Sequence, residues 1–277
     1  MTTPSENRNL ALFCDFENVA LGVREAKYAQ FNIGLVLERL LLKGSIVVKK
    51  AYCDWDRYKD FKAGMHEASF ELIEIPHVRM SGKNSADIRM VVDALDLCYT
   101  KSHVDTFVII SGDSDFSPLV SKLRENNKTV IAVGVKNSTS NLLIANCDEF
   151  IFYDDLVREQ KGTTKRAEKK PARGKASAAT AAVAAPAATA EDKDKKQEAY
   201  DLVLATTEAL SAERGAEDKI WGSMVKQALK RRNPGFSESY YGFKSFNQLL
   251  EEAAARNLLV LERDEKSGGY IVRSAAH

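Results

Sequence analysis

One apolar segment ends in two closely spaced carboxylates. Residues 106–110 are Thr-Phe-Val-Ile-Ile, and Ser-Gly-Asp-Ser-Asp follows directly. A short continuous apolar run with β-branched residues is typical of a strand buried on both faces of a parallel sheet. The carboxyl ends of such strands face the ligand crevice, so we expect Asp113 and Asp115 at a binding site. Pro118 and the apolar residues after it predict that a helix follows.

A second predicted strand has the same kind of ending. Leu10–Cys14 is apolar and leads directly into Asp15, with Asn18 shortly after it. Asp is also a common helix N-cap, and capping alone would account for either motif. Capping accounts less well for acidic residues at the ends of two strands. We therefore expect Asp15 to lie beside the acidic loop after residue 110, with Asn18 and Ser111 close to it.

A third carboxylate is predicted on a helix between the two strands. Apolar residues recur at helical spacing over 88–98, with Asp87 in the first turn and Asp93 further along. The helix dipole also favours a carboxylate in the first turn, which gives Asp87 a purely structural explanation as well. Asp93 lies about 240° around an ideal helix from Asp87, so the two cannot both face one pocket. We favour Asp87 for the site and assign Asp93 a supporting role.

If these carboxylates converge, their negative charges are unfavourable unless another group neutralises them. They would repel one another and lose hydration, and a bound cation is the usual remedy. An all-oxygen ligand set suits Mg²⁺ or Mn²⁺ better than Zn²⁺. Such ions activate water and stabilise displacement at phosphorus, which indicates phosphodiester hydrolysis.

The segments Leu10–Asn18, Lys83–Asp87 and Val108–Phe116 resemble the NYN domain of the LabA-like group, a branch of the PIN-like nuclease superfamily. The resemblance covers roughly residues 8–156. It implies a metal-dependent ribonuclease that leaves 5′-phosphate and 3′-hydroxyl ends, although the family includes members without demonstrated activity. The implied metal-binding and catalytic residues are Asp15, Asp87, Asp113 and Asp115, supported by Asn18 and Ser111.

Predicted helices and strands alternate through this part of the chain. Helices are expected over 33–42, 57–68, 88–98 and 142–146, and strands over 10–14, 45–53, 70–75, 106–110, 129–135 and 150–153. This alternation implies a parallel sheet with right-handed crossovers. The prediction is a PIN-like three-layer α/β domain over residues 8–157.

The composition changes after Leu156. Lys161–Lys175 has seven Lys or Arg against one acidic residue, and 176–190 consists almost entirely of small residues. Without large apolar residues this stretch cannot bury a core, so 158–196 is predicted to be a flexible linker. Its basic half could hold phosphates without regard to sequence, or it could be a solubilising spacer. Its alanines could make part of it transiently helical.

A second, smaller domain is predicted over 197–273. Helices are expected over 200–210, 220–231 and 246–255, followed by a hairpin of strands 258–261 and 270–272. Three helices and a hairpin predict a winged-helix-like α+β domain. The element Tyr241–Phe246, with Trp221 and Val225 before it, resembles the OST-HTH or LOTUS domain. That resemblance implies binding of RNA or of a protein partner.

Several basic side chains are candidates for holding RNA. They are Lys83, Arg89 and Lys136 around the acidic site, and Lys226, Lys230, Arg231, Arg232 and Lys244 in the second domain. Each of them, taken alone, is better explained as a solvated surface charge. The whole chain carries a net charge of only +1, so any RNA-binding surface must be a local patch.

The overall composition fits a cytoplasmic protein with two cores. The chain has 277 residues, of which 44% are apolar, enough for both predicted domains. Its four cysteines are widely spaced in apolar surroundings, which predicts reduced thiols. The amino terminus has no charged and then apolar leader, and no run approaches the ~20 apolar residues of a membrane span.

We therefore predict a metal-dependent endoribonuclease with a tethered module for RNA or protein partners, and leave homodimer formation open. One alternative is a non-catalytic RNA-binding or regulatory adaptor that keeps the acidic pocket. The other is a nuclease acting on DNA, because no feature of the sequence identifies a contact to a 2′-hydroxyl.

Overall fold

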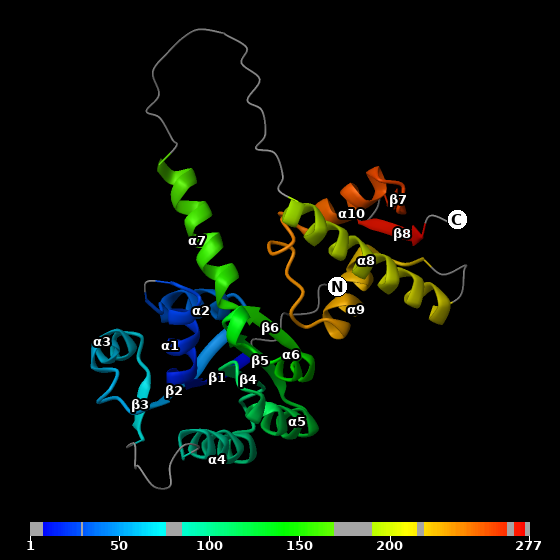
Figure 1. Ribbon diagram of the computed structural model, residues 1–277. Coiled ribbons are helices and arrows are strands. Elements are labelled where there is room, and N and C mark those ends of the chain that lie inside the picture. Colours follow the sequence, from blue (N-terminus) through cyan, green and yellow to red (C-terminus); the bar gives the residue numbers. More distant parts are fainter. Residues whose placement is uncertain are drawn as a thin grey trace. The chain divides into compact units, whose positions relative to one another are not determined.

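The computed structural model describes residues 8–28, 30–75, 85–168, 190–214, 219–264 and 269–274 of the chain (Figure 1). The chain divides into two compact units, residues 1–160 and 161–277. None of the helices in the described ranges has both the length and the apolar character needed to cross a bilayer.

A six-stranded parallel sheet forms the centre of the first unit. Its strands are β1 (Arg8–Asp15), β2 (Gly44–Cys53), β3 (Glu71–Glu74), β4 (Thr106–Ile110), β5 (Thr129–Gly134) and β6 (Glu149–Phe152). They lie in the order β3-β2-β1-β4-β5-β6, and every neighbouring pair is parallel. This sheet confirms the predicted α/β fold. The strand order reverses between β1 and β4, and the crevice at the carboxyl ends of such a pair is where open α/β sheets bind ligands.

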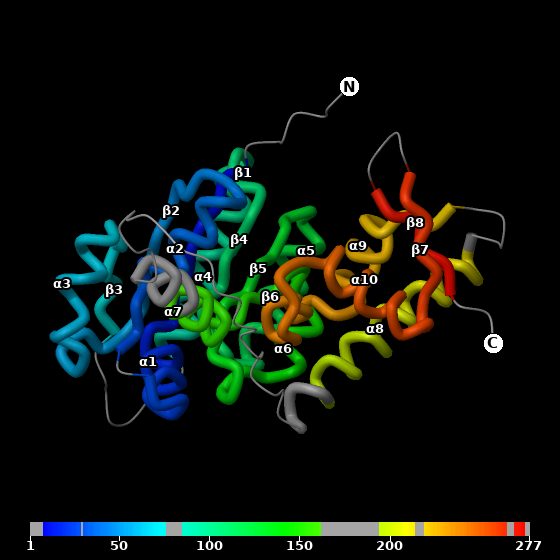
Figure 2. The backbone as a smooth tube through the Cα atoms, turned by 90° about the horizontal axis from the view of Figure 1, so that it is seen from above, coloured from blue at the N-terminus to red at the C-terminus, as the bar shows by residue number. Residues whose placement is uncertain are grey.

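Helices cover both faces of this sheet (Figures 1 and 2). Side chains alternate along β1, so that Leu10 and Leu12 join one core while Ala11 and Phe13 join the other. The first core includes side chains of α1 (Phe16–Glu25), α2 (Ile33–Leu41), α3 (Lys59–Glu67) and α7 (Tyr153–Glu168). The second includes side chains of α4 (Ser85–Thr100), α5 (Ser117–Glu125) and α6 (Asn141–Asn146). The first unit therefore has three layers.

The four cysteines are free and buried. Cys14 and Cys53 end their apolar strand segments, Cys98 lies on α4 and Cys147 follows α6. Burial raises the pKa of the Cys147 thiol to about 12. These residues are protonated thiols of the core, as the sequence predicts.

In the second unit, the described residues after 189 form three helices and a hairpin. They are α8 (Ala190–Arg214), α9 (Gly222–Arg232), α10 (Phe246–Ala255) and the antiparallel strands β7 (Leu259–Arg263) and β8 (Tyr270–Ser274). Tyr241, Phe243 and Phe246 are all buried and belong to its core. The aromatic element of this unit therefore stabilises the fold rather than offering exposed rings.

Both ends of the predicted linker 158–196 are helical. Helix α7 continues to Glu168 and α8 begins at Ala190, while residues 169–189 lie outside the described ranges. Ala, Lys and Glu all have high helix propensity. A segment with too few large apolar residues to form a core of its own can therefore still continue a helix of the neighbouring domain.

Gly44 begins β2 at a point where β1 lies very close. A Cβ here would overlap the carbonyl oxygen of Arg8 and would lie 2.7 Å from Leu10 Cδ1. Gly44→Ala is therefore expected to lower the free energy of unfolding by about 1–3 kcal/mol, measured by urea denaturation. Gly64→Ala on α3 is the matched control, because a Cβ there meets no atom within 4 Å. Alanine favours a helix, so this control should be neutral or stabilising; equal losses for both variants would contradict the close-contact explanation.

Candidate active site

Asp15 is the last residue of β1 and the N-cap of α1. Its Oδ1 accepts a hydrogen bond from the backbone N–H of Asn18 at 3.4 Å, and its Oδ2 accepts one from Ser111 Oγ at 3.0 Å. The residue is only 7% exposed. Burial, and after it the charge of Asp87, raise the pKa of Asp15 to about 7 despite the two hydrogen bonds. Each carboxylate oxygen has a second lone pair. Asp15 can therefore cap α1 and still offer both oxygens to a ligand at the site.

The acidic loop after β4 is ordered by its own side chains. The Asp113 amide donates to Ser111 Oγ at 3.2 Å, and the Asp115 amide donates to Asp113 Oδ1 at 2.9 Å. Asp113 is thereby the N-cap of the short 3₁₀ helix η1 (Ser114–Phe116). Ser111 links this loop to Asp15, so the two strand ends that the sequence predicts to meet do so.

Two neighbouring segments hold the loop at Gly112. Its amide donates to Asn18 Oδ1 at 2.9 Å, and its carbonyl oxygen accepts from the Ser140 amide at 2.9 Å. A Cβ on Gly112 would lie 2.5 Å from the Ser138 carbonyl oxygen. Asn18 is thus a positioning residue for the acidic loop, and the polar segment 138–140 is its second support.

Asp87 lies in the first turn of α4, and the other carboxylates act on it. Burial raises its pKa, and the charges of Asp113, Asp115 and Glu17 raise it further. Glu17 was not predicted as a site residue. Its position in the first turn of α1, two residues after Asp15, is the signal that could have found it.

Asp93 belongs to a different network. Its Oδ2 accepts from Tyr52 Oη at 2.9 Å and lies 3.6 Å from Lys50 Nζ, while its Oδ1 pairs with Arg89 Nε at 3.0 Å. These partners lie on β2 and on α4 itself. The structure therefore brings Asp87 but not Asp93 to the other carboxylates, and Arg89 pairs with Asp93.

The remaining predicted basic residues are spread over the chain. The Lys136 amide donates to Asp154 Oδ2 at 2.8 Å, and its Nζ lies 6.0 Å from the centre of the Phe152 ring. Lys83 lies outside the described residues. In the second unit, Lys226 pairs with Glu238 at 2.8 Å, Lys230 is half-buried, and Arg231, Arg232 and Lys244 are exposed.

The chemistry of the acidic group fits a hard divalent cation. Asp15 is a buried carboxylate and Asp87 a half-buried one; the charges that act on both are negative and raise their pKa values, whereas the hydrogen bonds to Asp15 lower its pKa. Carboxylate oxygens with Asn and Ser nearby match the preferences of Mg²⁺ and Mn²⁺. Within the described residues, however, no three acidic, His or Cys side chains converge closely enough to form a complete ligand set.

Residues 9–154 match the NYN domain family, a stretch that covers more than half of the chain and includes all four carboxylates. The chain belongs to this family. NYN domains are part of the PIN-like nuclease superfamily, so the acidic edge of the sheet lies in a nuclease fold. The match ends before the second unit begins.

Two other proteins are similar to part of this chain. An uncharacterized protein of Methanocaldococcus jannaschii is 32% identical over 120 residues, which are 41% of this chain and 45% of that protein. The chain thus spans less than half the length of this curated relative. The crystal structure of a protein of unknown function from Vibrio parahaemolyticus is 28% identical, with a TM-score of 0.49, over 56% of this chain and 98% of that one.

Proposed function

We propose that the protein is a metal-dependent endoribonuclease of the LabA-like group of NYN proteins. The observation that carries the proposal is the buried carboxylate of Asp15, which accepts a hydrogen bond from Ser111 and is repelled by Asp87 and Asp113. A carboxylate so placed is costly to the fold unless a cation binds beside it. Natural proteins retain such costs at functional sites.

In this proposal the four carboxylates bind the cation, and two neighbouring residues position them. Asp15, Asp87, Asp113 and Asp115 would hold Mg²⁺ or Mn²⁺. When bound, the ion supplies activation of water and stabilisation of negative charge at the phosphorus. Ser111 orients Asp15 by donating to its Oδ2, and Asn18 fixes the acidic loop through the Gly112 amide. A rigid sheet edge and these two hydrogen bonds keep the carboxylates in place before the substrate arrives.

We also propose that the second unit is an OST-HTH or LOTUS module that binds RNA or a protein partner. Exposed Arg231 and Arg232 end α9, and exposed Lys244 precedes α10. These charges support a local phosphate-binding patch on a unit whose Tyr241, Phe243 and Phe246 rings belong to its core. Lys226 is less available for RNA, because it pairs with Glu238.

The test is cleavage of end-labelled single-stranded RNA and of DNA with the same sequence, in Mn²⁺, Mg²⁺ or EDTA. We expect internal cleavage of RNA that requires the cation and leaves 5′-phosphate ends. Intact RNA across several sequences and both metals, from folded protein, would indicate the non-catalytic adaptor. Faster cleavage of DNA would indicate a DNA nuclease.

Gly112→Ala is expected to lower RNA cleavage by at least about tenfold, because a misplacement near 1 Å has large effects on catalysis. The new Cβ would push the acidic loop away from the Ser138 carbonyl oxygen and strain the bond to Asn18. Initial cleavage rates would be compared with the melting temperature of the same preparation. Unchanged activity would show that the contact with segment 138–140 does not position the carboxylates.

A further inference from the structure

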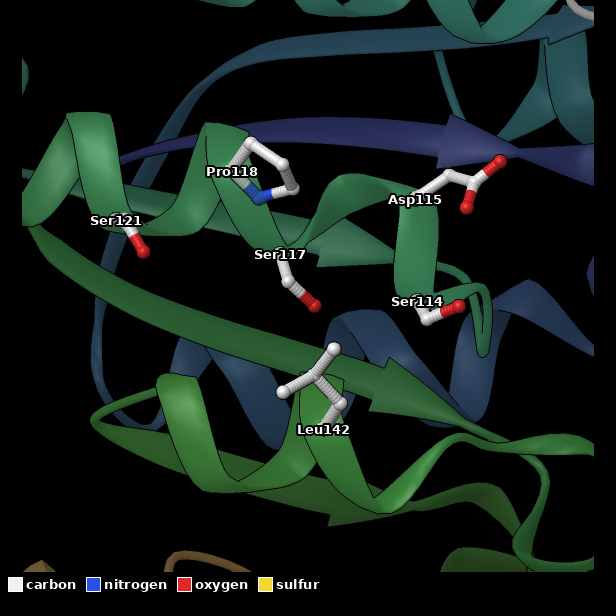
Figure 3. A pocket seen from close by; sticks show the side chains of 6 residues that line it. All are labelled: Ser114, Asp115, Ser117, Pro118, Ser121 and Leu142. Carbon is white, nitrogen blue, oxygen red and sulfur yellow. The ribbon is translucent and has the colours of Figure 1, made fainter.

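A pocket of about 620 Å³ lies beside the acidic loop (Figure 3). It is lined by Ser114, Asp115, Ser117, Pro118, Ser121 and Leu142, which come from η1, the first turns of α5 and the start of α6. The pocket is a shallow depression, largely open to solvent. One wall of the pocket is Asp115, so its contents would lie next to the proposed catalytic carboxylates.

Ser117 is the unusual member of this lining. The residue is only 7% exposed, and its Oγ has no hydrogen-bond partner among the described groups. Figure 3 shows this hydroxyl pointing toward Leu142, into the space between α5 and α6. Buried hydroxyls in native proteins are nearly always hydrogen bonded, so this unpartnered one indicates a missing partner. Ser117 Oγ has less than 1 Å² of accessible surface, so a partner in the pocket reaches it when the exposed side chain of Leu142 shifts.

The other lining groups restrict what that partner is. Serine hydroxyls both donate and accept hydrogen bonds, whereas the Asp115 carboxylate only accepts. Among the described residues that line the pocket, none is Lys or Arg. Leu142 is 57% exposed and adds an apolar surface. This combination disfavours a phosphate and suits an uncharged group that has hydroxyls on one side and C–H groups on the other, as a pentose does.

We propose that this pocket holds the ribose next to the scissile phosphate, and that Ser117 Oγ forms a hydrogen bond with its 2′-hydroxyl. The inference rests on the proposed nuclease function and adds to it the basis for choosing RNA over DNA. A deoxyribose would leave the Ser117 hydroxyl buried and unpartnered, and sites with such groups reject analogues that lack the partner. The 2′-hydroxyl is the group by which a protein distinguishes RNA from DNA at a given position.

The experiment couples a protein change to a substrate change. Wild type and Ser117→Ala are compared on a 12-nucleotide RNA and on versions with one deoxynucleotide at each successive position. Cleavage rates are measured in Mn²⁺ and dissociation constants in EDTA by fluorescence anisotropy. We expect one deoxy position to weaken the wild-type rate or affinity roughly threefold to tenfold, the size of one hydrogen bond. Ser117→Ala should show a similar loss on full RNA and no further loss at that position.

Folding and catalysis are controlled separately. Ser117→Ala removes a hydroxyl without a partner, so its melting temperature should equal or exceed that of wild type. Ser102→Ala, in an exposed turn, is the matched control and should respond to every deoxy position as wild type does. Cleavage without coupling at any position would overturn the ribose pocket and leave the nuclease proposal intact. Coupling in affinity without cleavage would support the pocket and refute the nuclease, and absence of coupling in both measurements would overturn the pocket.

Discussion

Asp15→Asn is expected to abolish cation-dependent RNA cleavage, with kcat/KM lowered by about 10²–10³-fold or more. The substitution keeps the size of the side chain and an oxygen that can accept from Ser111, but it removes the negative charge that a cation needs. Asp15 is the most buried of the four carboxylates and receives hydrogen bonds from both α1 and Ser111. We therefore expect that no other carboxylate of the group takes over the cation-binding role of Asp15 in the variant.

The measurement is initial-rate cleavage of single-stranded RNA in Mn²⁺ by wild type and variant. Asp93→Asn is the matched control, because Asp93 bonds to Tyr52 and Arg89 outside the acidic group. We expect it to keep at least about half of the activity at a temperature where it is folded, since it makes no contact with the reacting groups. Equal losses in the two variants would refute the assignment, because they would show that the loss of activity is not specific to the acidic group.

The fold of the first unit was predictable because its signals are local. Several strands contain a short apolar run, and some helices begin after a residue whose side chain caps them, such as Asn32 before α2 or Ser140 before α6. Alternating strands and helices then leave few topologies for a parallel sheet. The helices that reach Glu168 and begin at Ala190 were expected only as a transient helix in part of the linker, because composition indicates the absence of a core but does not fix where a helix begins or ends.

The candidate site was only partly predictable. Asp15 and Asp113 follow directly from strand ends, where the backbone direction fixes their position. The choice between Asp87 and Asp93 depends on the rotation of α4, which is set by distant contacts such as that of Asp93 with Tyr52. A sequence does not reveal that pairing, since it joins residues 41 positions apart.

The roles of residues that act through packing could not be predicted from the sequence. Gly112 is important because the carbonyl oxygen of Ser138 lies beside it, a contact between two separate loops. Ser117 looks like an ordinary residue at the start of a helix, and only its burial without a partner marks it. Both properties arise from the way η1, α5 and α6 meet.

Mn²⁺ or Mg²⁺ is expected to raise the melting temperature of the wild-type protein, and Asp15→Asn is expected to abolish this rise. A ligand that binds only the folded state at 100 times its dissociation constant adds about 2.7 kcal/mol to the free energy of unfolding. For a domain of this size that amounts to a shift of several degrees. Thermal unfolding in EDTA and in increasing concentrations of each ion would measure it for both proteins.

The same substitution should act with the opposite sign when EDTA removes the ion. In wild type, burial of the Asp15 carboxylate and, after it, repulsion by Asp87 raise its pKa to about 7. An amide at this position carries no charge, and its NH₂ group is attracted by the neighbouring carboxylates. In EDTA, Asp15→Asn should therefore melt at a higher temperature than wild type, with a free energy of unfolding larger by on the order of 1–2 kcal/mol. A variant that is less stable in EDTA and still gains stability from Mn²⁺ would show that Asp15 is a structural cap and that the cation binds elsewhere.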